Sequence, residues 1–384
     1  MTRTEINIMK IMFTSLVFLI LSACSSHNIV SKSFSGNSKS KHPIRVIALK
    51  NTSPLQAIIP ELATHKAVLV GESHTDYGNH LNQLAVIKGL YPLWKKMAIG
   101  LEFIQQPYQK ALDDYIAGDI SEQQMLRKTQ WYERWRYDFR LYRPIFNYAK
   151  QKKIPLIALN TPREITKRIT KVGIKGLNKA ERAQLPNVID LSNTTYRKRL
   201  KKVYSHHAKT NSKKFERFFE AQVAWDESMA ARAASYLRLH PDHRIVILAG
   251  SGHIINRHGI PSRLERRIGS KTAVVLNSNN KSPHPDQGDY LLFSPDATLA
   301  KAGKMGIFMK DSKKGVMISQ VATDSAGDKA GLKKSDIITA INTHPTNSIQ
   351  DVKIIMMDKK PKEKVTLHIL RSGKQRLEKE LNLQ

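Results

Sequence analysis

The chain of 384 residues is long enough for two domains, or for one large domain with an appendage. Its 41% hydrophobic and 25% charged residues are typical of globular proteins and exclude a mainly disordered or collagen-like chain. The formal net charge of +31 predicts contact with something anionic, such as nucleic acid, a charged membrane surface or a polyanionic ligand. The single cysteine excludes an internal disulfide and any site built from several cysteines.

Residues 1–23 have the pattern of a signal peptide, with a charged start and an apolar run over 11–21 that is too short to span a bilayer. The run ends in Leu-Ser-Ala-Cys24, which resembles the bacterial lipobox, where the cysteine is lipidated, as with palmitate, and becomes the new N-terminus. In similar proteins a residue such as Ser25 at the next position favours the outer membrane. We therefore expect a lipoprotein that Cys24 anchors to the bacterial outer membrane, facing the periplasm, with a polar tether over 24–43.

Residues 44–278 alternate short β-branched runs with longer helical patterns, which is typical of βαβ units. Several strand candidates are continuously apolar, as expected for strands with helices on both faces. The clearest helix is expected at about 215–239. This region therefore predicts an α/β domain with a mainly parallel β-sheet flanked by helices. The strand candidates are 67–71, 98–103, 154–159, 245–250 and 272–276.

A stretch rich in Pro and Gly over 279–300 is expected to be a linker, and residues 301–384 differ in character. Ala-Gly-Leu332, Asp336-Ile-Ile and Ile-Asn342 resemble a PDZ domain of bacterial envelope proteases, a small β-sandwich or barrel with two helices. The resemblance implies that a peptide adds a strand beside a helix while a loop binds its carboxylate. A structural or dimerising role stays open, because this loop begins with Lys and Met instead of the usual Gly and Leu. The implied loop is Lys304, Met305, Gly306 and Ile307.

Polar residues follow four of the predicted strands. In an open parallel sheet the carboxyl ends of the strands share one edge, where ligands bind, so we expect these residues to converge. Each of them alone could be structural. Together, two imidazoles and two carboxylates could hold a divalent ion through His74, Glu102 and His253, act as general acid and base, or line a pocket without turnover. The residues are Glu72, His74, Glu102, Asn160, Arg163 and His253.

Several segments in the range 45–277 are together similar to the ChaN family of iron-regulated haem-binding lipoproteins. The resemblance implies haem as cofactor, a role in iron uptake, a tyrosine ligand with histidine support, and haem lying between the subunits of a homodimer. One departure is Asn79, where the family usually has a histidine that would pair with His80. The segments are Gly71-Glu-Ser-His74, Gly100-Leu-Glu-Phe103, Leu141-Tyr-Arg-Pro144, Asn160-Thr-Pro-Arg163, Trp225-Asp-Glu227 and Gly250-Ser-Gly-His253.

For haem, the chain must supply an axial ligand and cations for the propionates. Tyrosine and histidine both serve as axial ligands, and arginine pairs bidentately with carboxylates. We expect Arg143 and Arg163 to serve the propionates, with structural ion pairs as the alternative, and the aromatic cluster at 131–137 to be core more than lid. The candidate cofactor residues are His74, Tyr77, His80, Glu102, Tyr142, Arg143, Arg163 and His253.

The ChaN family is distantly similar to Tiki proteases and erythromycin esterases, which leaves a metal-dependent hydrolase as the alternative, with Glu72, His74, Glu102 and His253 as its catalytic set. An envelope scaffold that acts through the PDZ domain is a third hypothesis. The leading hypothesis is a lipid-anchored haem-binding protein, and enzymatic activity stays open. No nucleic-acid-binding motif accompanies the charge, so we expect the basic run 197–202 to be a solvated helix face against anionic lipid headgroups or lipopolysaccharide.

Overall fold

The computed structural model describes residues 51–205, 212–278 and 283–384. The predicted signal peptide, Cys24, the tether and residues 279–282 of the linker lie outside the described residues. None of the helices in the described part of the chain combines the length and the apolar character that crossing a bilayer requires.

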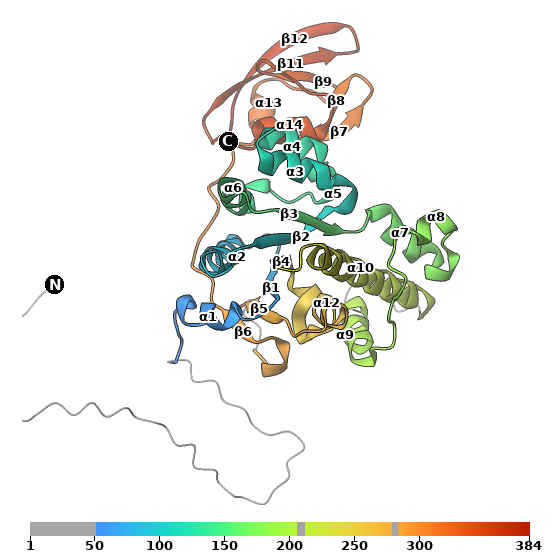
Figure 1. The fold of residues 1–384 in the computed structure, drawn as a ribbon. Coiled ribbons are helices and arrows are strands. Elements are labelled where there is room, and N and C mark those ends of the chain that lie inside the picture. Colours follow the sequence, from blue (N-terminus) through green and yellow to red (C-terminus); the bar gives the residue numbers. More distant parts are fainter. Residues whose placement is uncertain (1–50, 206–211, 279–282) are drawn as a thin grey trace, which may run out of the picture. The chain divides into compact units, whose positions relative to one another are not determined.

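In the described part of the large domain, six strands form one sheet in the order β3-β2-β4-β1-β5-β6, and every neighbouring pair is parallel (Figure 1). The expected mainly parallel sheet is confirmed. The short strand β6 was not predicted, because three residues are too few to show a period. The strands are β1 (Ala67–Glu72), β2 (Met97–Gln105), β3 (Leu156–Asn160), β4 (Arg244–Gly250), β5 (Ala273–Asn277) and β6 (Tyr290–Leu292).

Helices cover both faces of this sheet, which explains why its central strands are apolar at consecutive positions (Figure 1). On one face Val68 and Val70 pack in a core with residues from α2 to α6, and on the other Leu69 packs with α10 and α12. The helices are α1 (Ile59–Leu62), α2 (Tyr77–Leu90), α3 (Gln109–Ala117), α4 (Glu122–Lys128), α5 (Trp131–Arg134), α6 (Arg143–Lys152), α7 (Arg163–Val172), α8 (Lys179–Arg182), α9 (Thr194–Ser205), α10 (Ser212–Leu239), α11 (Ser251–Ile254) and α12 (Ile260–Ile268).

The C-terminal region contains a separate antiparallel sheet in the order β12-β11-β9-β8-β7, with β10 paired to β9. Helix α14 is preceded by Ser348, which forms a capping box with Asp351. This is the sheet with two helices that the resemblance to PDZ domains implied. Its elements are β7 (Ile307–Ser312), β8 (Gly315–Val321), β9 (Ile337–Ile341), β10 (His344–Pro345), β11 (Lys364–Arg371), β12 (Gln375–Asn382), α13 (Ala326–Lys329) and α14 (Ile349–Met356).

Candidate functional site

The carboxyl ends of β2, β4 and β1 lie side by side, because these strands are consecutive in the sheet. Glu72 ends β1, Glu102 lies near the end of β2, and His253 lies in α11 directly after β4. His74 contacts Glu72, and His253 contacts Glu102. The predicted convergence of these two histidines and two glutamates is therefore confirmed, and it produces two neighbouring carboxylate–imidazole groups.

The first group is built on Glu72, whose carboxylate is fully buried. Its Oε1 lies 2.9 Å from Nδ1 of His74 and accepts a 3.0 Å hydrogen bond from the Tyr142 hydroxyl. Its Oε2 lies 3.2 Å from Nδ1 of His80. His80 is 1% exposed, and its Nε2 lies 3.3 Å from the carbonyl oxygen of His74. Both ring nitrogens of His80 are thus used inside the protein, so His80 supports Glu72 and is not presented to a ligand.

Charge pairing decides the protonation of this group. Burial would raise the pKa of Glu72, but the hydrogen bonds and charges of His74 and His80 lower it to about 2. Burial would likewise lower the pKa of both histidines, and the Glu72 carboxylate instead raises the pKa of each above its ordinary value. Glu72 is therefore a carboxylate near neutral pH and holds the two imidazoles in fixed orientations.

The second group is built on His253, which is held between two carboxylates. Its Nδ1 lies 2.6 Å from Asp226 Oδ1, and its Nε2 lies 3.2 Å from Glu102 Oε1. Glu102 Oε2 also accepts a 2.6 Å hydrogen bond from the backbone N–H of Gly250. The Tyr196 hydroxyl donates to the other oxygen of Asp226. Burial would lower the pKa of His253, but the charges of Glu102 and Asp226 raise it to about 10.

Sequence reasoning missed Asp226 as a member of this cluster. It comes from α10, and Tyr196 comes from α9, so neither follows a strand of the sheet. The available signal was the acidic pair Asp226 and Glu227 inside an otherwise apolar helical stripe, because a buried charge requires a partner.

Gly250 lies between the two groups and permits their close approach. A side-chain carbon at Gly250 would lie 2.8 Å from Cε1 of His74 and 3.5 Å from Glu102 Oε2. The His74 ring therefore passes directly over the main chain between the two groups, and only glycine leaves room for it.

Aromatic rings flank the exposed edge of His74. The ring centroids of Trp135 and Tyr137 lie 4.7 Å and 5.0 Å from that of His74, and Trp135 Nε1 donates a 3.0 Å hydrogen bond to the Tyr142 hydroxyl. The side chain of His74 is 29% exposed. The predicted aromatic cluster thus divides in two: Trp131 is core, whereas Trp135 and Tyr137 are half-buried beside His74.

The two tyrosines proposed as haem ligands occupy other environments. Tyr142 is 0% exposed, and burial together with the charge of Glu72 raises its pKa well above the ordinary value, so it is a neutral donor to Glu72. Tyr77 is the first residue of α2 and packs against the large core. Tyr142 is buried and Tyr77 is half-buried, so neither side chain is fully exposed.

The arginines predicted for the propionates are engaged elsewhere. Arg143 forms ion pairs of 2.9 Å with Glu122 and 2.6 Å with Asp358, which is the structural alternative left open above. Arg163 donates to the carbonyl oxygen of Glu133 and not to a carboxylate of the cluster. A guanidinium that already has two carboxylate partners, like that of Arg143, is a poor anchor for a third.

The predicted Asn160 and the departure at Asn79 both stabilise the backbone around the site. Asn160 donates a 2.7 Å hydrogen bond to the Glu102 carbonyl oxygen, which ties the ends of β3 and β2 together. Asn79 accepts from the backbone N–H of Ser73 and donates to Ser294. Asn79 thus shapes the loop that carries His74, at the position where the resembling family has a histidine.

Within residues 51–205, 212–278 and 283–384, no three His, Cys, Asp or Glu side chains are arranged to hold a metal ion. The oxygens of Glu102 contact Gly250 and His253, and both nitrogens of His253 face carboxylates. Metal binding by His74, Glu102 and His253 stays a prediction.

We expect His253 to make the free energy of unfolding decrease as the pH rises from about 6.5 to about 10. A histidine whose pKa is raised on folding stabilises the native state fully below its unfolded pKa and loses that contribution as the pH passes its folded pKa. Urea unfolding at both ends of this range should show that the free energy of unfolding of the wild type falls by at least ~1 kcal/mol. This fall should be absent in His253→Gln. His243→Gln, which alters an imidazole beside Asp242 at the surface, should keep the wild-type slope. Equal slopes for the wild type and His253→Gln would contradict the assignment.

Known proteins match the chain in two separate regions. The family model described as "Haem-binding uptake, Tiki superfamily, ChaN" matches residues 58–264, and the PDZ domain model matches residues 303–382. A solved structure, "Cofacial heme binding to ChaN of Campylobacter jejuni", is 20% identical with a TM-score of 0.50 and covers 62% of this chain and 90% of that chain. At this identity the likeness shows the shared fold.

Curated relatives match only part of the chain. The periplasmic pH-dependent serine endoprotease DegQ of Escherichia coli is 39% identical over 78 residues, which cover 20% of this chain and 16% of DegQ. The periplasmic serine endoprotease DegP of Escherichia coli is 27% identical over 167 residues, 43% of this chain and 33% of DegP. The chain thus spans a third or less of these relatives. Because the haem-binding uptake model matches more than half of the chain, the protein belongs to the ChaN family of the Tiki superfamily and carries a C-terminal PDZ domain.

Proposed function

We propose that this protein binds haem at the carboxyl edge of its parallel sheet, with Nε2 of His74 as the ligand of the iron. The observation that supports this choice most is the exposure and the fixed orientation of the His74 imidazole. It is the partly exposed imidazole of the cluster, and a buried carboxylate fixes its Nδ1. The family to which the chain belongs is described as haem-binding, which supplies the ligand class.

The residues around His74 fit a porphyrin. A carboxylate that accepts from the second nitrogen of a metal-bound histidine fixes the ring and raises its basicity, and Glu72 is placed to do so. Within the described residues, no hydrogen bond engages Nε2 of His74. Trp135 and Tyr137 add apolar ring surface beside it. When bound, haem supplies an iron that accepts this nitrogen, and the protein orients the donor.

Arg136 replaces Arg143 as our candidate for a propionate. It lies between Trp135 and Tyr137 in the sequence, is exposed, and adopts a left-handed backbone conformation with φ of 77°. Its side chain contacts the carbonyl oxygen of Glu133, and within the described residues its charge is not paired with a carboxylate. An exposed cation that is adjacent in the chain to two half-buried aromatic rings suits haem, which is flat and apolar and carries two negatively charged propionates.

A haemin titration tests this function. The mature protein should give a saturable shift of the Soret band, and the iron and the porphyrin should elute together with the protein on gel filtration. Absence of a shift at micromolar haemin would contradict haem binding. The role in iron uptake follows only if the loaded protein then transfers haem to an acceptor.

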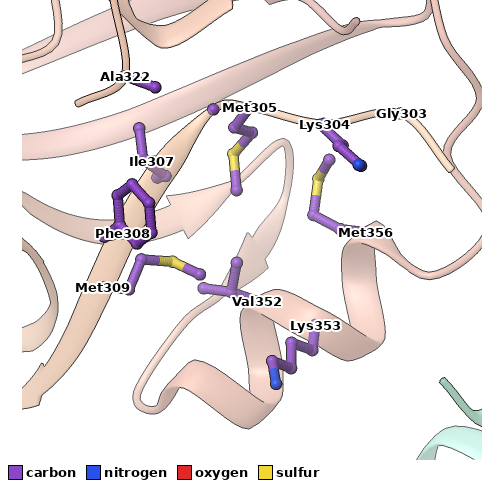
Figure 2. A pocket seen from close by; sticks show the side chains of 11 residues that line it. Gly303, Lys304, Met305, Ile307, Phe308, Met309, Ala322, Val352, Lys353 and Met356 are labelled. Atoms are coloured by element: carbon purple, nitrogen blue, oxygen red, sulfur yellow. The ribbon is translucent and has the colours of Figure 1, made fainter. Parts of the chain in front are cut away.

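We also propose that the PDZ domain binds the carboxyl end of a peptide. A cavity of about 300 Å³ lies between the predicted loop with β7 and helix α14 (Figure 2). Gly306 shapes this loop, because its φ is 70° and a side chain would lie 2.1 Å from Cβ of Ser325. The departure at Lys304 and Met305 from the usual loop sequence leaves the cavity open, since both residues line it.

We propose in addition that Cys24 is lipidated and holds the protein at the outer membrane. The basic helix α9 supports a location beside anionic headgroups, because Lys198, Lys201 and Lys202 are exposed on it. Arg197 and Arg199, by contrast, are half-buried, so only part of the basic run forms the solvated face that we predicted.

Cys24→Ser should release the protein from the membrane fraction, because a lipid anchor contributes about 0.8 kcal/mol for each buried methylene group. Fractionation of cells that express the wild type and the variant measures this. Ser26→Ala, a change in the same stretch, is the matched control and should leave the protein in the membrane fraction. Equal membrane retention of Cys24→Ser and the wild type would exclude lipid anchoring at this residue.

A further inference from the structure

Helix α14 of the PDZ domain belongs to two hydrophobic cores at once. Val352 and Ile355 pack in the core of the PDZ domain, which α14 shares with β8, β9 and β11. Ile354, on the same helix, and Met357, the residue after it, pack in the main core of the large domain and are 2% and 5% exposed. A helix that is buried on both sides cannot shift without disturbing both cores.

Polar contacts fix the same helix to α4 and α5 of the large domain. Arg127 Nε donates a 2.8 Å hydrogen bond to Asp351. The side-chain oxygen of Gln350 accepts from the backbone N–H of Tyr132, and its amide group donates to the carbonyl oxygen of Arg127. The side chain of Gln350 is 6% exposed. These bonds connect α14 to the main chain of α5 and not only to surface charges.

The elements that α14 contacts are those that form the proposed haem site. Trp131 of α5 packs against Tyr142 with 5.2 Å between ring centroids, and Trp135, directly after α5, packs against His74. Asp358, just after α14, pairs with Arg143, which is adjacent to Tyr142 in the chain. Contacts of α5 and of Arg143 therefore connect α14 with the part of the chain that carries Tyr142 and Trp135.

The opposite side of α14 forms one wall of the peptide cavity. Val352, Lys353 and Met356 line it (Figure 2). The Nζ atom of Lys353 lies 5.4 Å from the centre of the Tyr132 ring, so this one side chain contacts both the cavity and α5. Burial and the charge of Arg136 lower the pKa of Lys353.

We propose that haem binding at His74 and peptide binding in the PDZ cavity are coupled through α14, each strengthening the other. This inference rests on the proposed haem and peptide functions. The partner is a protein whose free carboxyl-terminal residue is large and apolar, because Met305, Ile307, Met309 and Met356 line the cavity and methionine adapts to varied apolar shapes. Because α14 packs in both cores, a ligand that holds α14 in one position at its own site also favours that position at the other site.

Hydrogen exchange measured with and without haemin tests the coupling directly. Haemin should slow the exchange of backbone amides in α14 and β7, although neither element touches His74. Soret titration of the same sample shows whether haemin is bound. If haemin binds and α14 exchanges at an unchanged rate, the coupling is wrong. If haemin does not bind, the proposed haem function and this inference both fail.

A double variant, Arg127→Gln with Asp358→Asn, should weaken the protection of α14 while haemin still binds, because it removes two contacts across the shared helix without changing the net charge. Its matched control is Lys364→Gln with Glu380→Gln, which removes an exposed ion pair between β11 and β12. The control should behave as the wild type. Equal protection in both double variants would contradict a role for these contacts.

Peptide binding measures the same coupling from the other side. The probe is a labelled decapeptide that ends in Leu-Phe with a free carboxylate, and its carboxamide form is the control. Haemin should tighten binding of the acid by about 5-fold or more, and by thermodynamic linkage the peptide should tighten haemin by the same factor. An unchanged affinity, or an acid that binds no better than the amide, would overturn the proposal.

Discussion

His74→Ala is expected to abolish saturable haemin binding, whereas His240→Ala, at an exposed histidine directly after α10, is expected to leave it unchanged. The alanine variant loses the nitrogen that we assign to the iron. Glu72→Gln should weaken haemin binding by about 10–100-fold, because a carboxylate partner of a metal-bound histidine contributes about that much. Soret titration of each purified variant gives the affinities.

Tyr142→Phe separates a histidine ligand from a tyrosine ligand. It removes the hydroxyl that donates to Glu72 but leaves His74 in place. We expect a moderate loss of affinity with the ligand-field spectrum of the bound iron unchanged. If Tyr142→Phe abolishes binding while His74→Ala retains it, the assignment of His74 is wrong and the family's tyrosine ligand applies here.

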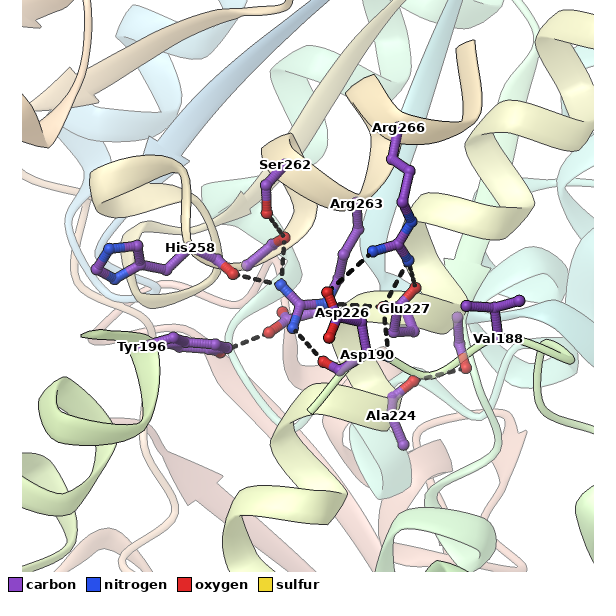
Figure 3. A network of polar contacts seen from close by, with 12 residues as sticks. Val188, Asp190, Tyr196, Ala224, Asp226, Glu227, His258, Ser262, Arg263 and Arg266 are labelled. Carbon is purple, nitrogen blue, oxygen red and sulfur yellow. Dashed lines mark hydrogen bonds and ion pairs between the residues drawn. The ribbon is translucent and has the colours of Figure 1, made fainter. Parts of the chain in front are cut away.

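Glu227→Ala is expected to destabilise the protein by about 3–5 kcal/mol, because it removes a buried carboxylate that pairs with the buried Arg263 and with two partly exposed arginines. Glu227 is 0% exposed on α10 and accepts from Arg266 at 2.8 Å, while Arg263 lies 3.3 Å away (Figure 3). Glu227 also accepts from Arg267 at 2.5 Å. All three arginines come from α12. The network therefore joins the two helices that cover one face of the sheet.

Urea unfolding measures this loss, with Glu380→Gln as the control. Glu380 pairs with Lys364 at the surface, where both side chains are 65% exposed, and solvent screens such a pair strongly. The control should lose far less stability than Glu227→Ala. Equal and small losses in both variants would show that the arginines find other partners.

Much of the fold was predictable from the pattern of apolar residues. The runs around Val68, Leu156 and Ile245 predicted central strands of a parallel sheet, since consecutive apolar positions require cover on both faces. The predicted strands recur within a few residues, and the helix expected at about 215–239 is α10. Strand β6 was not predicted, because its three residues are too few to show a periodic pattern of apolar residues.

The candidate site was predictable only where its residues follow strands. Glu72, His74, Glu102 and His253 converge because parallel strands end at one edge. Asp226 reaches His253 from α10, and no local pattern indicates which side of a long helix meets which strand end. Arg143 was expected at a propionate but pairs with Asp358, more than 200 positions away, which no local signal reveals.

The sequence by itself determined that the protein has an α/β domain with polar residues at the strand ends, followed by a PDZ domain, because apolar periodicity and turn residues act over short distances. Only the tertiary structure decided the exposure and the charge partners of those residues. Burial and charge pairing make His80 a support for Glu72, place His253 between two carboxylates, and leave His74 partly exposed. These properties depend on which side chains meet in space, since the energy of a buried charge is set by its neighbours and not by its own residue type.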